Sequence, residues 1–249
     1  MQVMRIWAGG KSWTVTGEGF DPHGAFVDAS GTETDVTADA DLRHVLMISA
    51  YCNDAELIAT DGRPGVQGNP TEGALVVAAA NAGITREGIR ERDIDTLRAF
   101  PFDSTRKMMS VLVRLPDGER LLVAKGAPDV ILAQATEMRM NGEVVPLTEA
   151  RRAEVEAVIA EFGSRALRTL AVAYKRVAKD QADGDLTDLE QDVILIGVHG
   201  IIDPPRPEVR AAVSEAASAG VRTVMITGDH AATAQAIAEE IGIKTSDAQ

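Results

Sequence analysis

The sequence predicts a mixed α/β protein in two parts, an α+β part followed by a short parallel α/β segment. In the first part, apolar runs separated by tight-turn sequences predict antiparallel hairpins, and stretches with apolar residues at helical spacing lie between them. In the second part, predicted helices alternate with one apolar run, an order typical of parallel α/β structure. We therefore expect a domain boundary between 1–199 and 200–249.

Composition and charge exclude several classes of function. The chain has 249 residues, enough to bury a core, and its aromatic content of 4% makes that core mainly aliphatic. A formal charge of -13 disfavours nucleic acids and anionic membranes as partners, because both are bound largely by neutralising phosphates. The single cysteine, Cys52, excludes an intrachain disulfide, and no Cys or His spacing indicates zinc. Without a bilayer-length apolar run or a signal peptide, we expect a chain that neither spans a membrane nor is exported.

Three segments in the first third of the chain carry clear local signals. Residues 1–17 predict two short strands around a Gly-Gly-Lys turn. Residues 37–53 have apolar side chains at helical spacing, with Thr37 or Asp39 as the N-cap. Residues 69–83 predict a second helix, because a proline stands near its start, an acidic residue in its first turn and a glycine at its end.

The middle of the chain adds a hairpin, a helix and two strands. Residues 107–126 form the clearest hairpin signal, since two apolar runs flank the turn sequence Pro-Asp-Gly-Glu. Residues 148–167 predict an amphipathic helix with four apolar side chains on one face. Strand-forming runs follow over 168–177 and 192–202, and the acidic stretch 179–191 between them is expected to be a loop.

After Ile202 the pattern changes to strand–helix alternation. A Pro-led helix is predicted over 203–220, a buried parallel strand over 221–226, a turn over 227–229 and a further helix over 230–243.

The turn Thr227-Gly228-Asp229 falls where open α/β folds bind phosphate, at the carboxyl edge of a sheet before the positive end of a helix. Thr227 would donate to a phosphoryl oxygen, Gly228 would let that group approach the backbone, and Asp229 would contact a ribose or a metal-bound water. An ordinary turn with Asp229 as the helix cap explains the same residues, and spacing alone does not decide.

Asp203 precedes two prolines, which keep it out of helical φ/ψ. Such an acidic elbow suits a hinge or a site near phosphate and metal, although a Pro-led helix start is the better local explanation.

Phe102 lies close to two cations, Arg106 and Lys107. An aromatic face there would sandwich a purine while the cations meet its phosphates. The alternative is a core phenylalanine beside a solvated charge pair.

Three further positions admit both a binding and a structural interpretation. Lys125 and Gly126 end an apolar run just before a helix that starts at Pro128, which suits anion capture or a charged turn. Glu72 stands at a helix N-terminus, where capping explains it completely. Arg168 at a strand start is either a phosphate clamp or a surface charge.

In their order along the chain, these motifs resemble the cytoplasmic part of the P-type cation-transporting ATPases, most closely the calcium-pump-like branch. KGAP together with TGDxxxTAxAIAxxxGI is specific to that family. The resemblance covers essentially the whole chain and is carried by TGEGFDPHGAF (16–26), GNPTEGAL (68–75), FDSTRKMMSV (102–111), KGAPDVIL (125–132), LRTLAVAY (167–174), GIIDPPRPEV (200–209) and MITGDHAATAQAIAEEIGI (225–243).

The resemblance implies the fold of each part. Residues 1–199 correspond to the nucleotide-binding (N) domain, a twisted, mainly antiparallel sheet with flanking helices. Residues 200–249 correspond to part of the phosphorylation (P) domain, which has a haloacid-dehalogenase-like parallel α/β fold.

The resemblance also implies roles for individual residues. Phe102 corresponds to the aromatic that stacks on adenine, and Glu72 to the acid at the adenine amino group. The remaining correspondences are Lys107 and Lys125 with the pocket lysines, Gly126 with the glycine under the base, Arg168 with the arginine that reaches the phosphates, and Asp203, Thr227, Gly228 and Asp229 with motifs around the γ-phosphate and the transferred phosphoryl group.

The sequence departs from the family pattern in several places. It contains no DKTGT stretch with the phosphorylated aspartate, no GDGxND segment whose acid binds Mg²⁺, and no membrane helices. Ser104 stands where an arginine often lies, and His230 where many relatives have asparagine. We therefore expect a fragment cut at both ends within the P domain, and whether 200–249 folds in it is an open question.

The resemblance implies the function of a pump fragment. In the intact enzyme, ATP binds the N domain and its γ-phosphate passes to an aspartate while Mg²⁺ bridges phosphate oxygens, which drives cation transport. The fragment is expected to be soluble, to lie on the cytoplasmic side of a membrane (the plasma membrane in a bacterium), and to partner the rest of the pump. It should bind adenine nucleotide weakly and form no phosphoenzyme.

Two alternatives belong to other classes. One is a free-standing haloacid-dehalogenase-type phosphatase, against which the absence of a DxDx(T/V) motif counts. The other is a non-catalytic nucleotide-sensing domain. Among transported ions, calcium is favoured by the branch resemblance alone.

Overall fold

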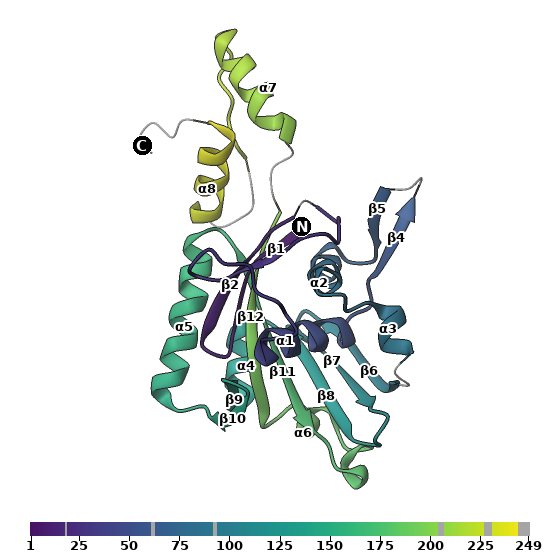
Figure 1. Ribbon diagram of the computed structural model, residues 1–249. Helices are drawn as coiled ribbons and strands as arrows, with labels where there is room; N and C mark the ends of the chain where they lie inside the picture. Colours follow the sequence, from purple (N-terminus) through teal and green to yellow (C-terminus); the bar gives the residue numbers. More distant parts are fainter. Residues whose placement is uncertain (18, 61–62, 92–93, 204–206, 227–230, 244–249) are drawn as a thin grey trace.

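The computed structural model describes residues 1–249 except 18, 61–62, 92–93, 204–206, 227–230 and 244–249. Most of the described chain is built around one ten-stranded sheet with helices on both faces (Figure 1). This is the mixed α/β architecture, with a large antiparallel sheet and flanking helices, that the sequence predicts.

The large sheet is antiparallel in every described pairing except that of β12 with β9, which is parallel. The strand order is β3-β2-β1-β12-β11-β8-β7-β6, with β9 beside β12 and β10 beside β9. Its strands are β1 (Gln2–Ala8), β2 (Lys11–Val15), β3 (Phe26–Val27), β6 (Asp95–Asp103), β7 (Met108–Arg114), β8 (Arg120–Gly126), β9 (Ala135–Met140), β10 (Glu143–Pro146), β11 (Arg168–Arg176) and β12 (Val193–Ile202). A separate hairpin is formed by β4 (Glu56–Thr60) and β5 (Arg63–Gln67).

The helices cover the two faces of this sheet and continue beyond one of its ends (Figure 1). They are α1 (Ala40–Tyr51), α2 (Pro70–Asn81), α3 (Arg86–Arg90), α4 (Pro128–Gln134), α5 (Glu149–Ser164), α6 (Leu186–Leu189), α7 (Pro207–Ser218) and α8 (Ala231–Ile241), with a short 3₁₀ helix at Lys179–Gln181. No helix in the described ranges combines the length and apolar character needed to cross a bilayer.

Two hydrophobic cores form because successive residues of a strand point to opposite faces of the sheet. On one face, Leu42 of α1 and Leu75 of α2 pack with Val123 of β8. On the other face, Ile131 of α4 and Phe162 of α5 belong to a second cluster with residues of β11 and β12. The sheet is therefore sandwiched between α1 and α2 on one side and α4 and α5 on the other.

The predicted local signals are confirmed where they depend on a cap or a turn. Asp39, one of the two predicted N-caps of α1, accepts hydrogen bonds from the backbone N–H groups of Asp41 and Leu42 at 3.1 and 3.0 Å. The hairpin of β7 and β8 is closed by the N–H of Leu115 donating to the carbonyl of Glu119 at 2.8 Å. The strands over 1–17, the helix over 148–167 and the strands over 168–177 and 192–202 also form, with small shifts at their ends.

The prediction of a buried strand over 221–226 is wrong. These residues connect α7 to α8 without regular structure, and Val221, Val224 and Ile226 are 59%, 67% and 94% exposed. A parallel strand is stable only between hydrogen-bonded neighbours, and in the part of the chain that is described no strand lies beside this segment.

The prediction of a plain loop over 179–191 is also wrong. This stretch contains the 3₁₀ helix and α6, and the side chain of Glu190 is buried. Its apolar residues Ala182 and Leu189 pack with Leu112 and Leu122 of the sheet. Apolar anchors spaced along an acidic sequence therefore fold it against the sheet.

Candidate functional site

Six strand ends meet at one end of the large sheet, and the predicted site residues that are described gather there. The pairs that define this end are Asp103 with Met108, Met108 with Gly126, Gly126 with Ala171, Arg168 with Ile201, and Gln2 with Ile202. In Figure 1 it is the end marked by the N-terminus. The residues on or next to these strand ends are Phe102, Lys107, Lys125, Gly126, Arg168 and Asp203, and Glu72 joins them from the first turn of α2.

Lys125 and Glu72 form an ion pair between the Nζ and Oε1 atoms. Lys125 is the second-last residue of β8 and is 5% exposed, and Glu72 is 15% exposed. Lys125 points to the α1 and α2 face, like Val123 two residues earlier. The N-cap of α2 is Asn69, which accepts from the N–H of Thr71 at 2.9 Å, so Glu72 is not the cap but an acid in the first turn whose side chain reaches Lys125.

Polar groups around this ion pair are buried and uncharged. Asn53 donates to the backbone carbonyl of Glu72 at 3.0 Å. Burial raises the pKa of the Cys52 thiol to about 12, so it stays protonated. Burial, reinforced by the charge of Lys125, lowers the pKa of His199 to about 3, so this imidazole is neutral near pH 7.

The tautomer of His199 follows from its neighbour Ser49. The Ser49 hydroxyl donates to the carbonyl of Val45 at 2.7 Å, so it accepts from His199 Nε2, which lies 2.8 Å away. His199 Nδ1 is then an unprotonated acceptor, and it has no hydrogen-bond partner among the described residues.

Gly126 is required by the packing of the adjacent strand. A Cβ atom at this position would lie 2.6 Å from the Cβ of Met108 and 2.8 Å from the carbonyl oxygen of Lys107. That carbonyl also accepts from the N–H of Ala127 at 2.9 Å. The start of β7 therefore passes directly over Gly126.

Phe102 and Lys107 flank the turn between β6 and β7, and both are exposed, Phe102 by 64%. Asp103 Oδ1 accepts from the N–H groups of Thr105 and Arg106 at 2.9 Å each, and these bonds lower the pKa of the Asp103 carboxyl. Lys107 has a φ of 55°, a left-handed conformation, and its Nζ lies 3.9 Å from Asp129 Oδ2.

Arg168 and Asp203 stand at the same end of the sheet without joining the buried pair. Arg168 is exposed at the start of β11, three residues from Ala171, which faces Gly126. Asp203 follows β12 and accepts from the amino group of Met1 at 3.0 Å. In the described ranges neither forms a hydrogen bond or ion pair with Lys125. The predicted residues Thr227, Gly228 and Asp229 lie outside the described residues, as does His230.

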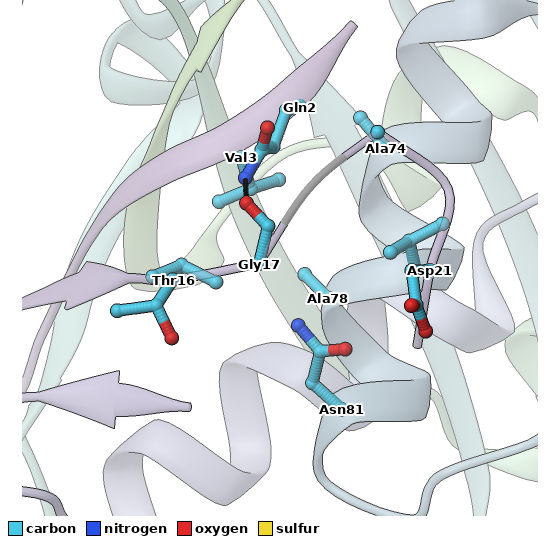
Figure 2. Close-up of a pocket in the computed structure, with 11 residues that line it drawn as sticks. Gln2, Val3, Thr16, Gly17, Asp21, Ala74, Ala78 and Asn81 are labelled. Atoms are coloured by element: carbon cyan, nitrogen blue, oxygen red, sulfur yellow. Dashed lines mark hydrogen bonds between the residues drawn. The ribbon is translucent and has the colours of Figure 1, made fainter. Parts of the chain in front are cut away.

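Two hollows in the described structure lie apart from these residues. Figure 2 shows a small pocket between β1, β2 and α2, in which Gln2 Nε2 donates to the carbonyl of Gly17 at 2.6 Å. A larger hollow of about 620 Å³ opens by the β7–β8 turn, at the opposite end of the sheet, beside Leu115 and Tyr174. Within the described ranges, no cluster of three or more His, Cys, Asp or Glu side chains is arranged to hold a metal ion.

Comparison with known proteins places these residues in a family context. A family model described as P-type ATPase, cytoplasmic domain N, matches residues 41–208. The calcium-transporting ATPase of Bacillus subtilis is 42% identical over 241 residues, covering 97% of this chain and 27% of that protein. Calcium-transporting ATPase 1 of Lactococcus lactis is 37% identical, with 94% and 26% covered. The endoplasmic reticulum-type calcium-transporting ATPase 3 of Arabidopsis thaliana is 34% identical, with 93% and 26% covered. The chain spans about a quarter of the length of these relatives.

Proposed function

The chain belongs to the P-type ATPases, matching their cytoplasmic domain N, and we propose on that premise that it binds adenine nucleotide where Phe102, Lys107 and Lys125 meet. The observation that supports this most is the convergence of these residues at one end of the sheet, although they come from three strand ends. An aromatic face, exposed cations and a buried carboxylate can meet the base, the phosphates and the amino group of a purine nucleotide.

Phe102 supplies the flat apolar face of the proposed site. Its side chain is 64% exposed at the end of β6, whereas phenylalanine is among the residues most often buried. Stacking of a base on an exposed aromatic ring contributes about 1–3 kcal/mol. Because the ring makes little contact with the core, it is free to receive the base without unfolding any element.

Glu72, Lys125 and Gly126 form the inner wall in this proposal. Lys125 engages only one oxygen of Glu72, and a carboxylate has several acceptor positions, so Glu72 retains capacity to accept from the adenine amino group. The ammonium of Lys125 likewise has three donors, of which the ion pair uses one. The ion pair therefore orients both side chains before the base arrives.

Lys107 and Arg168 are the cations proposed to meet the phosphates. Both are exposed, and Lys107 Nζ has only a long contact, 3.9 Å, with Asp129. In a chain of net charge -13, exposed cations at one sheet end give a local attraction for a polyanion.

For the rest of the chain we propose the division into 1–199 as the N domain and 200–249 as a haloacid-dehalogenase-like part of the P domain. The last strand of the sheet, β12, ends at Ile202, close to this boundary. Around the γ-phosphate and the transferred phosphoryl group we propose Asp203, Thr227, Gly228 and Asp229.

For the whole protein we propose ATP-driven cation transport on the family pattern, through an aspartyl phosphate, with Mg²⁺ as cofactor and the rest of the pump as partner. The named relatives are calcium-transporting ATPases, so Ca²⁺ is the first ion to test. The chain contains no DKTGT sequence. Therefore it should bind nucleotide on the cytoplasmic side of the membrane without itself forming a phosphoenzyme.

A titration followed by ¹⁵N–¹H correlation spectra tests the binding proposal. ATP added to the full chain should shift the amide signals of the 102–107 turn and of 125–127, while those of the β7–β8 turn at the opposite end stay in place. Adenosine should shift the signals of Phe102 and of 125–127, and inorganic tripolyphosphate should act mainly near Lys107. Absence of any shift at these positions with ATP at up to about 10 mM would refute the proposal. Hydrolysis of p-nitrophenyl phosphate by the chain would favour the phosphatase alternative.

A further inference from the structure

The guanidinium of Arg106 points back into the protein, although Arg106 lies in the turn that carries Phe102 and Lys107. The side chain is 21% exposed. Its Nη2 atom donates to three backbone carbonyls, those of Phe100 at 3.2 Å, Pro101 at 2.8 Å and Met108 at 3.1 Å. These three carbonyls lie on both sides of the turn, so one side chain ties its two arms together.

The carbonyls need this donor because the ladder between β6 and β7 is interrupted here. Phe100 pairs with Ser110 and Asp103 with Met108, so two residues of β6 stand opposite one of β7. Phe102 is one of these two β6 residues. A bulge of this kind leaves backbone groups without ladder partners and re-aims a side chain. Arg106 therefore stabilises the bulge that presents Phe102.

Glu190 anchors the other end of the guanidinium. Arg106 Nη1 donates to Glu190 Oε1 at 3.0 Å, and the Ser110 hydroxyl donates to the same oxygen at 2.5 Å. Glu190 is only 3% exposed and lies between β11 and β12 in sequence. A buried carboxylate with a charged donor and a hydroxyl donor makes a rigid anchor, because each contact is strengthened by the low local dielectric.

This anchor lies on the face of the sheet opposite to Lys125. Met109 faces Lys125 in the register and packs in the core beneath α1 and α2. Ser110, the next residue, points the other way and contacts Glu190. Arg106 and Glu190 can therefore influence a nucleotide only through the backbone of the turn.

The segment over 177–191 is attached to β6 at a second point. Arg98 Nη1 donates to the carbonyls of Ala182 at 3.0 Å and Gly184 at 2.8 Å. The ring of Phe100 lies under the same guanidinium, 4.7 Å from its Cζ atom. Both strands that lead to the turn are thus fastened to one segment behind the sheet.

We propose that Arg106, held by Glu190, is a positioning residue for the nucleotide site, and that the segment 177–191 thereby sets the affinity of that site for the adenine ring. This inference rests on the proposed function. The new element is that residues behind the sheet, which do not touch the nucleotide, set the affinity of the site for adenine.

The test is a double-mutant cycle on ATP affinity with the full chain. Arg106→Lys keeps the positive charge but removes the planar guanidinium that reaches both the carbonyls and Glu190. This substitution should weaken ATP binding about tenfold. In a Phe102→Ala background the same substitution should change the affinity less than about twofold, because its effect passes through the ring. General loosening of the fold would instead give additive losses.

Two further variants keep the test decisive. Arg114→Lys is the matched control, since Arg114 lies at the far end of β7, the strand that follows Arg106, and pairs with exposed Asp95. The ATP affinity of this variant should stay within about twofold of wild type. Glu190→Gln keeps the shape of the anchor without its charge and should weaken ATP binding about threefold. It carries the test if Arg106→Lys does not fold.

The outcomes distinguish failure of the positioning role of Arg106 from failure of the proposed nucleotide binding. Failure of the wild-type chain to bind ATP would overturn the proposed function and this inference together. Normal ATP affinity in folded Arg106→Lys would overturn the positioning role alone. If Arg106→Lys does not fold, normal ATP affinity in Glu190→Gln would have the same meaning. Additive losses of affinity for Arg106→Lys and Phe102→Ala would also overturn the positioning role.

Discussion

Lys125 and Glu72 form a nearly buried ion pair that joins the end of β8 to the first turn of α2. The two residues are 53 positions apart in the sequence. Removing such charges from water is costly, and their attraction offsets this cost only while both are present. The N-terminal end of α2 adds a favourable field for the carboxylate of Glu72. The pair is thus both a structural link and the inner wall of the proposed nucleotide site.

Breaking this pair on one side should be costly. Glu72→Gln leaves the ammonium of Lys125 buried without an opposite charge, and we expect a loss of about 2–4 kcal/mol in the free energy of unfolding, measured with urea. Asp95→Asn, in the exposed pair with Arg114, is the control and should cost less than about 0.5 kcal/mol. If the double variant Glu72→Gln/Lys125→Met is no more stable than Glu72→Gln, the desolvation account is wrong.

Phe102 should matter for nucleotide binding and little for folding. Phe102→Ala removes an exposed ring, so ATP affinity should fall tenfold or more while the free energy of unfolding changes by less than about 0.5 kcal/mol. Leu97→Ala, on the same strand and 38% exposed, should leave affinity unchanged. Calorimetric titration and urea unfolding measure the two effects. Equal affinities for the two variants would count against stacking at Phe102.

Gly126 should tolerate no side chain. Gly126→Ala places a methyl group within 3 Å of Met108 and of the Lys107 carbonyl, and we expect about 1–3 kcal/mol of destabilisation. Gly163, in the last turn of α5, has open space where a Cβ atom would lie. Gly163→Ala should therefore be neutral or stabilising by up to about 1 kcal/mol. Thermal unfolding of both variants distinguishes local crowding from a general effect of adding a methyl group.

His199 should make the protein sensitive to acid. The unfolded chain binds this proton near pH 6.5, whereas the pKa of about 3 in the folded chain keeps the imidazole neutral, so acidification between these values favours unfolding. At pH 5 the contribution is roughly 2 kcal/mol. His44, whose pKa burial lowers to about 4, acts in the same direction.

His199→Gln isolates the His199 contribution. Between pH 7 and 5, the free energy of unfolding of this variant should fall less than that of wild type. The difference between the two chains at pH 8, where the histidine is neutral in both states, corrects for altered packing. Parallel pH profiles for the two chains would show that His199 takes up no proton on unfolding.

The exposed segment 221–226 should tolerate polar side chains. Val224 is 67% exposed, so Val224→Ser should change the free energy of unfolding by less than about 0.5 kcal/mol. Val123→Ser, in the core strand β8, should cost several times more. A large loss at Val224 would indicate that this residue is buried in solution.

Elements whose signals are local could be predicted from the sequence. The hairpin of β7 and β8 follows from turn residues between two apolar runs, and α1 from its cap Asp39 and apolar spacing. The strand prediction for 221–226 is wrong because strand formation needs partners, and an apolar composition says nothing about their presence. Strands such as β6, with a bulge and mostly exposed side chains, carry no clear periodic signal.

For the candidate site, the sequence by itself determined which residue types are present and in what order, and so the family they resemble. Only the tertiary structure decided how they are used: it pairs Glu72 with Lys125, turns Arg106 away from Phe102, and packs Gly126 under the start of β7. The physical reason is that these relations depend on strand register and on helix placement, which join positions far apart in the chain. Turns and caps are decided by residues within a few positions of each other, and the sequence shows these directly.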